Sequence, residues 1–312
     1  MNEAPEAVRV EALSRSFGAL RAVDGLTFSA GKGELFGLVG PDGAGKTTTL
    51  RMLAGVLRPT SGDAILRGVS VARDPEGVKR HIAYMSQRFG LYTDLTVMEN
   101  LQFYADLYEV PRRERAARLT RLFEFSSLGP FRDRLAGQLS GGMKQKLGLS
   151  CALVHQPEIL LLDEPTFGVD PISRRDLWLI VHEMVAQGVT VIVSTSYMDE
   201  AERFDRLALL HRGRAVALDT PDGLRRLWDG AMVAIAVPRA REARTVIAGL
   251  QGAGRVALFG DQIHVGVRDA AADGPVIERA LRAAGFDVQD VRPIDPSLED
   301  VFMAIAESEV AS

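Results

Sequence analysis

The sequence has little of what marks several large classes of protein. It carries a single cysteine, Cys151, which excludes an internal disulfide framework and suits a reducing compartment. It has no stretch approaching about 18 consecutive apolar residues, so no membrane-spanning helix is expected. Its 37 Lys and Arg against 41 Asp and Glu disfavour attachment to nucleic acid through a basic surface. With no signal-peptide core near the acidic start, we expect a cytoplasmic protein.

The length and composition of the sequence fit a globular protein with one large and one small domain. Hydrophobic residues make up 46% of the 312 residues and charged residues 25%, which is ordinary for folded chains. The hydrophobic pattern changes character near residue 225, beside the turn-forming Pro221-Asp222-Gly223. We therefore expect one domain over residues 1–225 and a second over residues 226–312.

The first domain alternates strand and helix patterns. Apolar runs over residues 35–39, 159–162 and 189–193 indicate buried strands, and apolar residues at helical spacing follow from Thr47. Such alternation predicts an α/β fold with a mainly parallel sheet. Between about residues 88 and 150 the strand signal disappears and helical spacing takes over, which predicts a helical subdomain.

The second domain repeats a strand-helix-strand pattern. Strands are expected over residues 231–237, 255–259, 262–267 and 286–291, with a helix between the first two and another between the last two. This order is typical of a ferredoxin-like α+β fold. The segment contains no glycine-lysine loop, so we expect an accessory module without nucleotide chemistry.

A phosphate-binding loop is the strongest motif. Gly40 to Thr47 satisfies the spacing G-x-x-x-x-G-K-[ST] between a strand and a helix, a context that disfavours a mere flexible turn. Backbone N–H groups of such a loop surround phosphates, Lys46 adds a positive charge that we expect to be partly exposed, and Thr47 can ligate Mg²⁺. We expect Asp42 to point to solvent. The residues expected to hold ATP here are Gly40, Pro41, Asp42, Gly43, Ala44, Gly45, Lys46, Thr47 and Thr48.

Two carboxylates end the buried strand at residues 159–163. Asp163 is placed to hold Mg²⁺ through water, and Glu164 to accept a proton from an attacking water. A strand followed by a polar turn is the plain alternative, which the preceding phosphate loop disfavours.

A second anion-binding segment is formed by Ser140, Gly141 and Gly142 at the start of a predicted helix. One nucleotide on one chain does not require it. The segment is either an ordinary helix cap or a site offered to a nucleotide held by another subunit.

In this order the motifs resemble those of the ATPase subunits of ABC transporters, over about residues 6–225, and the resemblance implies a P-loop NTPase fold. It implies that Phe17 stacks on adenine beside Val23, that Gln87 contacts Mg²⁺ and the attacking water, that 139–143 is the signature, and that Asp170 lies in the D-loop. Residues 91–101 and the tail 296–302 resemble the drug-exporting, ABC-2-type branch, in particular the first ATPase half of YbhF-type efflux proteins.

One landmark of that family is missing. Where the resemblance calls for a histidine touching the γ-phosphate, this sequence has Ser196, which is shorter and carries no positive charge. We expect slow turnover at the chain's own phosphate loop and a heterodimer with a second ATPase subunit or domain rather than a homodimer. A homodimer in which Thr195, Tyr197 or a water fills the place is the alternative.

The resemblance implies a transport motor peripheral to the inner face of the cell membrane. Its partners would be integral-membrane permease subunits and, in an exporter, a periplasmic adaptor; no nucleic-acid partner is expected. The apolar residues around 89–100, Phe89 among them, either receive the permease or belong to the core. A soluble ABC ATPase acting on ribosomes or nucleic acid is the alternative function, and the acidic balance disfavours it.

Overall fold

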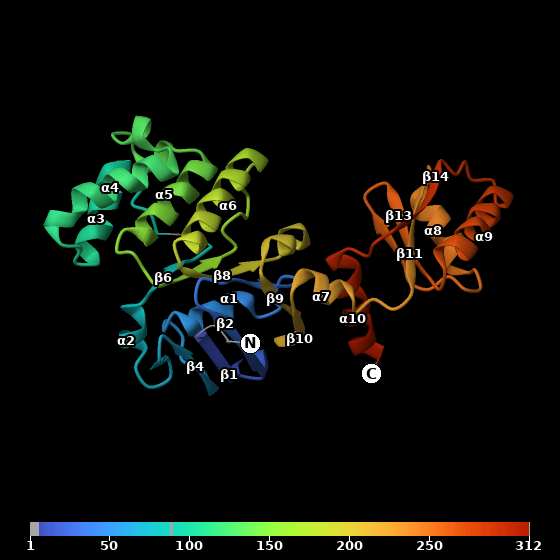
Figure 1. Ribbon diagram of the computed structural model, residues 1–312, viewed down its shortest axis with the longest axis horizontal. Coiled ribbons are helices and arrows are strands. Elements are labelled where there is room, and N and C mark those ends of the chain that lie inside the picture. Colours follow the sequence, from blue (N-terminus) through green and yellow to red (C-terminus); the bar gives the residue numbers. More distant parts are fainter. Residues whose placement is uncertain (1–5, 88–89, 312) are drawn as a thin grey trace. The chain divides into compact units, whose positions relative to one another are not determined.

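The computed structural model describes residues 6–87 and 90–311, with side chains described as far as residue 307. Phe89 therefore lies outside the described residues. The chain forms two compact units, residues 1–218 and 219–312 (Figure 1). Within the described ranges, no helix is both long and apolar enough to cross a bilayer.

The first unit opens with an antiparallel sheet of order β2-β1-β4-β5. Val8, Val10 and Leu13 of β1 point into the core, and Phe28 of β2 stacks on Phe36 of the next strand at 4.8 Å between ring centroids. The sheet thus covers the central core from one side. Its strands are β1 (Glu6–Phe17), β2 (Leu20–Gly31), β4 (Ser61–Leu66) and β5 (Val69–Ser70).

A six-stranded sheet of order β10-β9-β3-β8-β7-β6 forms the centre of this unit. Its inner strands run parallel, as predicted, and every residue of β3, β7 and β8 is buried. Because parallel strands end at a common edge, the loops after β3, β7 and β8 meet there. The strands are β3 (Leu35–Val39), β6 (Ile82–Met85), β7 (Ile159–Asp163), β8 (Thr190–Thr195), β9 (Arg206–His211) and β10 (Arg214–Asp219).

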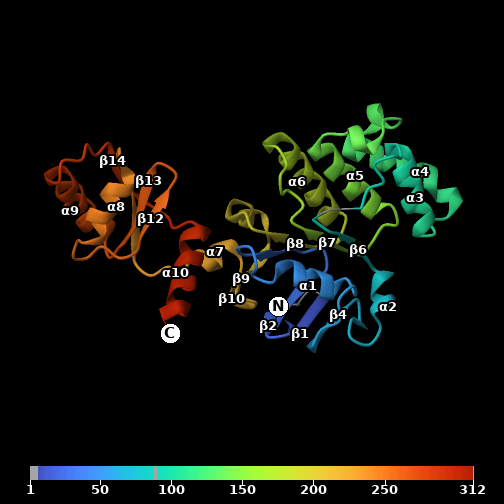
Figure 2. The same ribbon diagram turned by 180° about the vertical axis from the view of Figure 1, so that it is seen from behind.

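Helices cover both faces of the central sheet. Figure 2, like Figure 1, shows α5 and α6 on one side of the sheet and α1 on the other, and α1 contacts β7 and β8. The helices are α1 (Lys46–Leu53), α2 (Pro75–Lys79), α3 (Val97–Leu107), α4 (Arg112–Ser126), α5 (Gly141–Leu153) and α6 (Pro171–Ala186), with short 3₁₀ helices at Gly129–Phe131, Ala136–Gln138 and Met198–Arg203.

The region predicted to be helical contains α3, α4 and α5. Thr96 and Glu99 form a reciprocal capping box at the start of α3. The buried Asn100 amide holds the preceding loop by bonding to the backbone of Tyr92 and the carbonyl of Leu95. Tyr92 is nevertheless 47% exposed, so it belongs to the surface of this subdomain rather than to its core.

The second unit has the predicted βαββαβ order, with an antiparallel sheet of order β12-β13-β11-β14. The last strand was predicted over residues 286–291, but β14 begins at Asp290. Phe286 and Val288 are buried, and Asp287 and Gln289 are exposed. Buried and exposed side chains therefore already alternate before the hydrogen bonding of β14 to β11 begins at Asp290. The elements are α7 (Pro221–Arg225), β11 (Ala231–Ala236), α8 (Ala240–Ala248), β12 (Val256–Phe259), β13 (Gln262–Val267), α9 (Ala270–Ala283), β14 (Asp290–Ile294) and α10 (Leu298–Ala311).

Candidate functional site

The loop from Gly40 to Gly45 joins the end of β3 to the start of α1, and it requires glycine at two positions for different reasons. A Cβ at Gly40 would lie 2.3 Å from the carbonyl oxygen of Leu210. Gly45 has a φ of 100° and caps α1, and a Cβ there would lie 2.5 Å from the carbonyl oxygen of Ala22. The turn can therefore approach its neighbours only with glycine in these places.

Lys46 is almost fully covered by this loop. Its side chain is 4% exposed, and its ammonium donates to the carbonyls of Gly40 at 2.7 Å and Pro41 at 3.0 Å. The same ammonium lies 3.1 Å from Oε1 of Glu164. The expectation of a partly exposed lysine is wrong, because the loop folds back over its own lysine and the end of β7 closes the other side.

Asp163 receives three hydroxyl donors from three different elements. Thr47 Oγ1 donates to its Oδ1 at 2.9 Å and Ser194 Oγ to the same oxygen at 2.7 Å. Tyr84 donates from its hydroxyl to Oδ2 at 3.2 Å. Burial, together with the nearby Asp163 carboxylate, raises the pKa of Tyr84 to about 12, so the phenol remains a donor at neutral pH.

Glu164 is held in a backbone conformation that side chains rarely adopt. Its φ is 48°, its N–H donates to both the carbonyl and the hydroxyl of Ser194, and the residue is 7% exposed. A non-glycine residue in this region is strained by about 1–3 kcal/mol and persists only where its surroundings fix it. In this conformation the Glu164 carboxylate lies against the Lys46 ammonium.

A hollow of about 510 Å³ lies over the phosphate loop. Phe17, which is 48% exposed, and the exposed Gln87 border it, and the guanidinium of Arg15 lies 4.6 Å from the Phe17 ring. The predicted site residues that line the hollow are Phe17, Asp42, Gly43, Ala44, Gly45, Lys46, Thr47, Thr48, Gln87 and Glu164; Leu20, Arg21, Ala22 and Arg212 line it too.

Thr47, which lines the hollow, and the buried Asp163 bonded to it form a donor set that suits a magnesium ion. Thr47 and Asp163 present a hydroxyl and a carboxylate 2.9 Å apart, and hard oxygen ligands of this kind are those that Mg²⁺ prefers. In the described part of the chain, no group of three or more His, Cys, Asp or Glu side chains forms a metal cluster. The site therefore fits an ion that keeps part of its water or phosphate shell.

Several predicted site residues lie away from this hollow. Val23 is 1% exposed and belongs to the core, where its side chain packs below Gly45. Ser140 caps α5 by accepting from the Met143 N–H at 3.3 Å, and it does not line the hollow, nor do Gly141 and Gly142. The signature segment is thus not brought to the phosphate loop within one chain.

α5, which begins within the predicted signature segment, is instead packed against α6, whose N-cap is Asp170. A Cβ at Gly142 would lie 2.1 Å from Ser173 Oγ, so α5 and α6 touch at their first turns. Asp170 caps α6 by accepting from the Ser173 N–H at 3.0 Å, and this bond lowers the pKa of Asp170. The Lys146 ammonium and Asp176 join the two helices further along, at 2.5 Å.

Ser196 follows β8 and is half-buried outside the hollow. Glu200, 1% exposed, fixes the loop by accepting from Thr195 Oγ1 at 2.7 Å and from the Trp178 indole at 3.2 Å. The guanidinium of Arg174 lies over the ring of Tyr197 at 4.4 Å. The loop that carries Ser196 is therefore held in place by buried side-chain contacts.

Tyr84 and Ser194 were not identified from the sequence. Tyr84 lies near the carboxyl end of β6 and Ser194 near that of β8. Ligands bind at the carboxyl ends of parallel strands, so polar residues there are candidates for a site. That placement is a signal that could have found them.

The chain is similar to proteins of one known family. The family model described as ABC transporter matches residues 23–167. The "Probable multidrug ABC transporter ATP-binding protein YbhF" of Escherichia coli (strain K12) is 54% identical over 198 residues, which are 64% of this chain and 34% of that protein. This chain thus aligns with about a third of that relative's length.

Two further proteins are similar over more of their length. The daunorubicin resistance ATP-binding protein DrrA2 of Streptomyces coeruleorubidus is 36% identical over 304 residues, covering 96% of this chain and 94% of that protein. A solved structure of an ATP-binding subunit of an ABC transporter superposes with a TM-score of 0.65 at 33% identity, over 71% of this chain and 92% of the other. The predicted P-loop fold is confirmed, and the chain belongs to the family of ABC transporter ATP-binding proteins.

Proposed function

We propose that this chain binds ATP with Mg²⁺ and hydrolyses it to drive an ABC-2-type export complex. The observation that carries the proposal is the meeting of Lys46 and Thr47 with Asp163 and Glu164 at one edge of the sheet. The first pair belongs to a phosphate-binding loop and the second supplies carboxylates for metal and water. Lys46, Asp163 and Glu164 are buried and Thr47 is half-buried, and the contacts between them hold the four groups together.

Each residue has a distinct role in this proposal. Loop N–H groups, the start of α1 and Lys46 bind the phosphates. Thr47 and Asp163 would hold Mg²⁺, whose charge offsets that of the phosphates, and Gln87 at the border of the hollow would complete the set. Glu164 accepts the proton of the attacking water, which requires its release from the ion pair with Lys46.

We propose drug or other small-molecule efflux as the transport activity. The relatives named for multidrug transport and daunorubicin resistance support this choice. Permease subunits would supply the membrane spans, with this chain bound at the inner face of the membrane and a periplasmic adaptor completing the exporter. The exposed Tyr92, on the loop before α3, belongs to the surface offered to a permease.

We further propose that the chain works with a second ATPase subunit. Since Ser140 does not line the hollow that Lys46 lines, its segment is available to a nucleotide bound by another chain. At this chain's own phosphate loop, Ser196 replaces the γ-phosphate contact with a short neutral side chain. Loss of one such donor costs about 10²–10³ in rate, which favours a heterodimer over a homodimer.

A binding titration tests the nucleotide part of this proposal. A fluorescent ATP analogue should bind the wild-type chain saturably, and more tightly with Mg²⁺ than with EDTA. In Thr47→Ala, Mg²⁺ should no longer tighten the binding. Thr120→Ala, which removes an exposed hydroxyl bonded to the Ala116 carbonyl on α4, serves as the matched control outside the hollow. Binding that is indifferent to Mg²⁺ in the wild type would contradict the assignment.

A co-purification experiment tests the transport part. The tagged chain, expressed in cells, should be recovered from the membrane fraction with integral-membrane proteins and should appear in the soluble fraction after Tyr92→Asp. Recovery with ribosomes or nucleic acid instead would favour a soluble ABC ATPase and contradict the transport role.

A further inference from the structure

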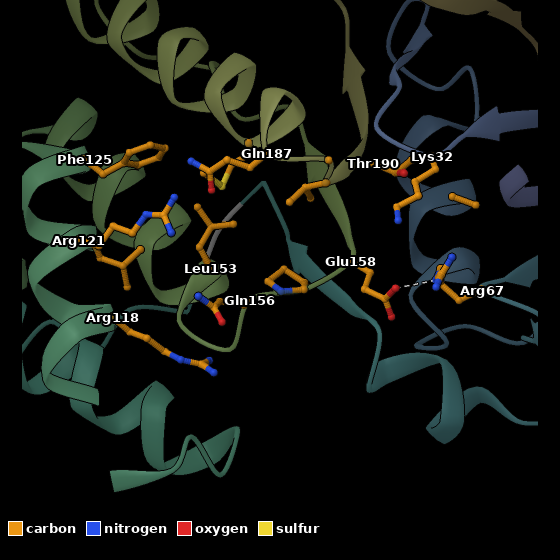
Figure 3. Close-up of a pocket in the computed structure, with 16 residues that line it drawn as sticks. Lys32, Arg67, Arg118, Arg121, Phe125, Leu153, Gln156, Glu158, Gln187 and Thr190 are labelled. Carbon is orange, nitrogen blue, oxygen red and sulfur yellow. Dashed lines mark ion pairs between the residues drawn. The ribbon is translucent and has the colours of Figure 1, made fainter. Parts of the chain in front are cut away.

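A second hollow lies in the first unit, at the edge of the central sheet opposite the phosphate loop. Its volume is about 440 Å³ (Figure 3). It is bordered by Lys32, shortly before β3, by Glu158, directly before β7, and by Thr190, the first residue of β8. Because these three strands are parallel, their amino ends share an edge, while the phosphate loop and Glu164 follow carboxyl ends. The hollow is therefore separate from the nucleotide site.

The lining combines a buried apolar surface with an excess of positive charge. The side chains of Leu122, Leu153 and Met184 are less than a tenth exposed, and the ring of Phe125 is half-buried beside them. Around this apolar surface stand four cationic side chains and one carboxylate: Lys32, Arg67, Arg118, Arg121 and Glu158.

Two of the four cations are already neutralised. The Arg67 guanidinium pairs with Glu158 at 2.7 Å. Arg118 donates to the carbonyl of Val154 at 3.0 Å and pairs with Glu114 at 2.6 Å.

The other two cations, Lys32 and Arg121, are free to meet a ligand. Among the described residues, neither side chain has a hydrogen-bond or ion-pair partner, and both residues are exposed. Figure 3 shows them on opposite walls, Arg121 from α4 and Lys32 from the side of the sheet, with the apolar Leu153 between them.

We propose that this hollow binds a small amphipathic organic anion, such as a medium-chain carboxylate or an aromatic sulfonate. The apolar body would lie against Leu153 and Phe125, and the anionic group would meet Arg121 or Lys32. The volume falls in the range of about 300–1,000 Å³ that small-molecule sites occupy. The surplus of cations disfavours a positively charged ligand, and the buried apolar surface disfavours a fully hydrated anion such as phosphate.

Binding of 8-anilinonaphthalene-1-sulfonate to the full chain tests this proposal. Its fluorescence is titrated with Mg-ATP in excess, so that the nucleotide hollow does not contribute. We expect Arg121→Glu and Lys32→Glu each to weaken binding by about twofold to fivefold, the loss of up to about 1 kcal/mol that one exposed ion pair gives. Phe125→Ala should weaken binding as well, through the lost apolar contact. Arg112→Glu is the matched control, because Arg112 is an exposed arginine on the same helix outside the hollow. Thermal melting by circular dichroism verifies that each variant is folded.

Competition identifies the ligand class. Laurate should displace the dye, whereas inorganic phosphate and dodecanol, which carry only the charge or only the apolar chain, should displace it at least tenfold less well. The proposal is overturned if Arg121→Glu and Lys32→Glu bind the dye as the wild type does. It is equally overturned if Arg112→Glu weakens binding to the same extent, or if phosphate or dodecanol competes as well as laurate.

Discussion

The ammonium of Lys46 lies 3.1 Å from the carboxylate of Glu164, and each side chain is less than a tenth exposed. This ion pair joins the phosphate loop to the end of β7, so the residue proposed to bind phosphate and the residue proposed to activate water are one structural unit. Removing one partner of a buried pair leaves an uncompensated charge. The pair therefore contributes to folding as well as to the proposed chemistry.

Lys46→Ala should lower the free energy of unfolding by about 3–5 kcal/mol and abolish ATP binding, because Glu164 is left buried without its cation. The double variant Lys46→Ala/Glu164→Gln should regain part of that stability without regaining binding. Urea denaturation measures the first effect and nucleotide titration the second.

Lys79→Ala provides the control for this substitution. Lys79 pairs with Glu76 at 2.6 Å, but both side chains are exposed, so a loss of no more than about 1 kcal/mol is expected. Equal losses in Lys46→Ala and Lys79→Ala would argue against a stabilising role for the buried pair.

Tyr84→Phe should raise the Mg²⁺ concentration that supports half-maximal ATP binding or hydrolysis by about tenfold or more. The phenol orients the Asp163 carboxylate, and loss of such an outer contact to a metal-holding group has effects of about 10–100-fold. Titration with Mg²⁺ at fixed ATP measures the change. Tyr104→Phe, which removes a hydroxyl bonded to the Gly90 carbonyl in the helical subdomain, should have no such effect. Identical Mg²⁺ curves for Tyr84→Phe and wild type would refute the positioning role.

The first unit should lose stability as the pH falls below about 6.5, in part because of His155. Burial lowers the pKa of this imidazole below its ordinary 6.5, and its buried Nδ1 has no hydrogen-bond partner among the residues that the structure describes. The unfolded chain then binds more protons than the folded chain, so the stabilisation is present above about pH 6.5 and is lost as the pH falls toward the folded pKa.

His155→Phe should reduce this pH dependence. The substitution keeps an aromatic ring on Tyr108, whose ring centroid lies 3.9 Å from that of His155. Urea denaturation at pH 7.5 and pH 5.5 provides the comparison. If the variant loses as much stability on acidification as the wild type, His155 is not responsible.

Truncation after Leu218 should leave nucleotide binding within about twofold of the full chain. The two units have separate apolar cores, one around β1 and α1 and the other around β11 and α9. The core of the first unit consists of residues before the truncation point, so it remains complete, and we expect assembly or regulation to be affected instead. A truncated chain that is folded by circular dichroism yet does not bind ATP would count against this division.

The phosphate loop, the carboxylate strand and the parallel sheet could be predicted because each depends on residues close together in the sequence. Gly40 to Thr47 specifies its own turn, and the apolar run before Asp163 specifies a buried strand. The local spacing of apolar residues also predicts the βαββαβ order of the second unit.

The remaining features depend on contacts between distant residues. Lys46 is buried because Glu164, 118 positions later, closes over it. Asp163 is oriented by Tyr84 and Ser194, which come from other strands, and nothing near Asp163 in the sequence indicates them. The start of β14 is set by its pairing with β11 rather than by the alternation that begins at Phe286.

The most direct test of the account is the ATPase activity of the purified chain alone, compared with that of Ser196→His. The wild type should bind ATP and hydrolyse it slowly, and Ser196→His should raise the rate by about 10²-fold or more by restoring a donor to the transferring phosphate. Ser196→Ala is the control and should leave the slow rate unchanged. Vigorous, cooperative hydrolysis by the wild type, abolished by Glu164→Gln, would contradict the weakened site and the need for a second ATPase.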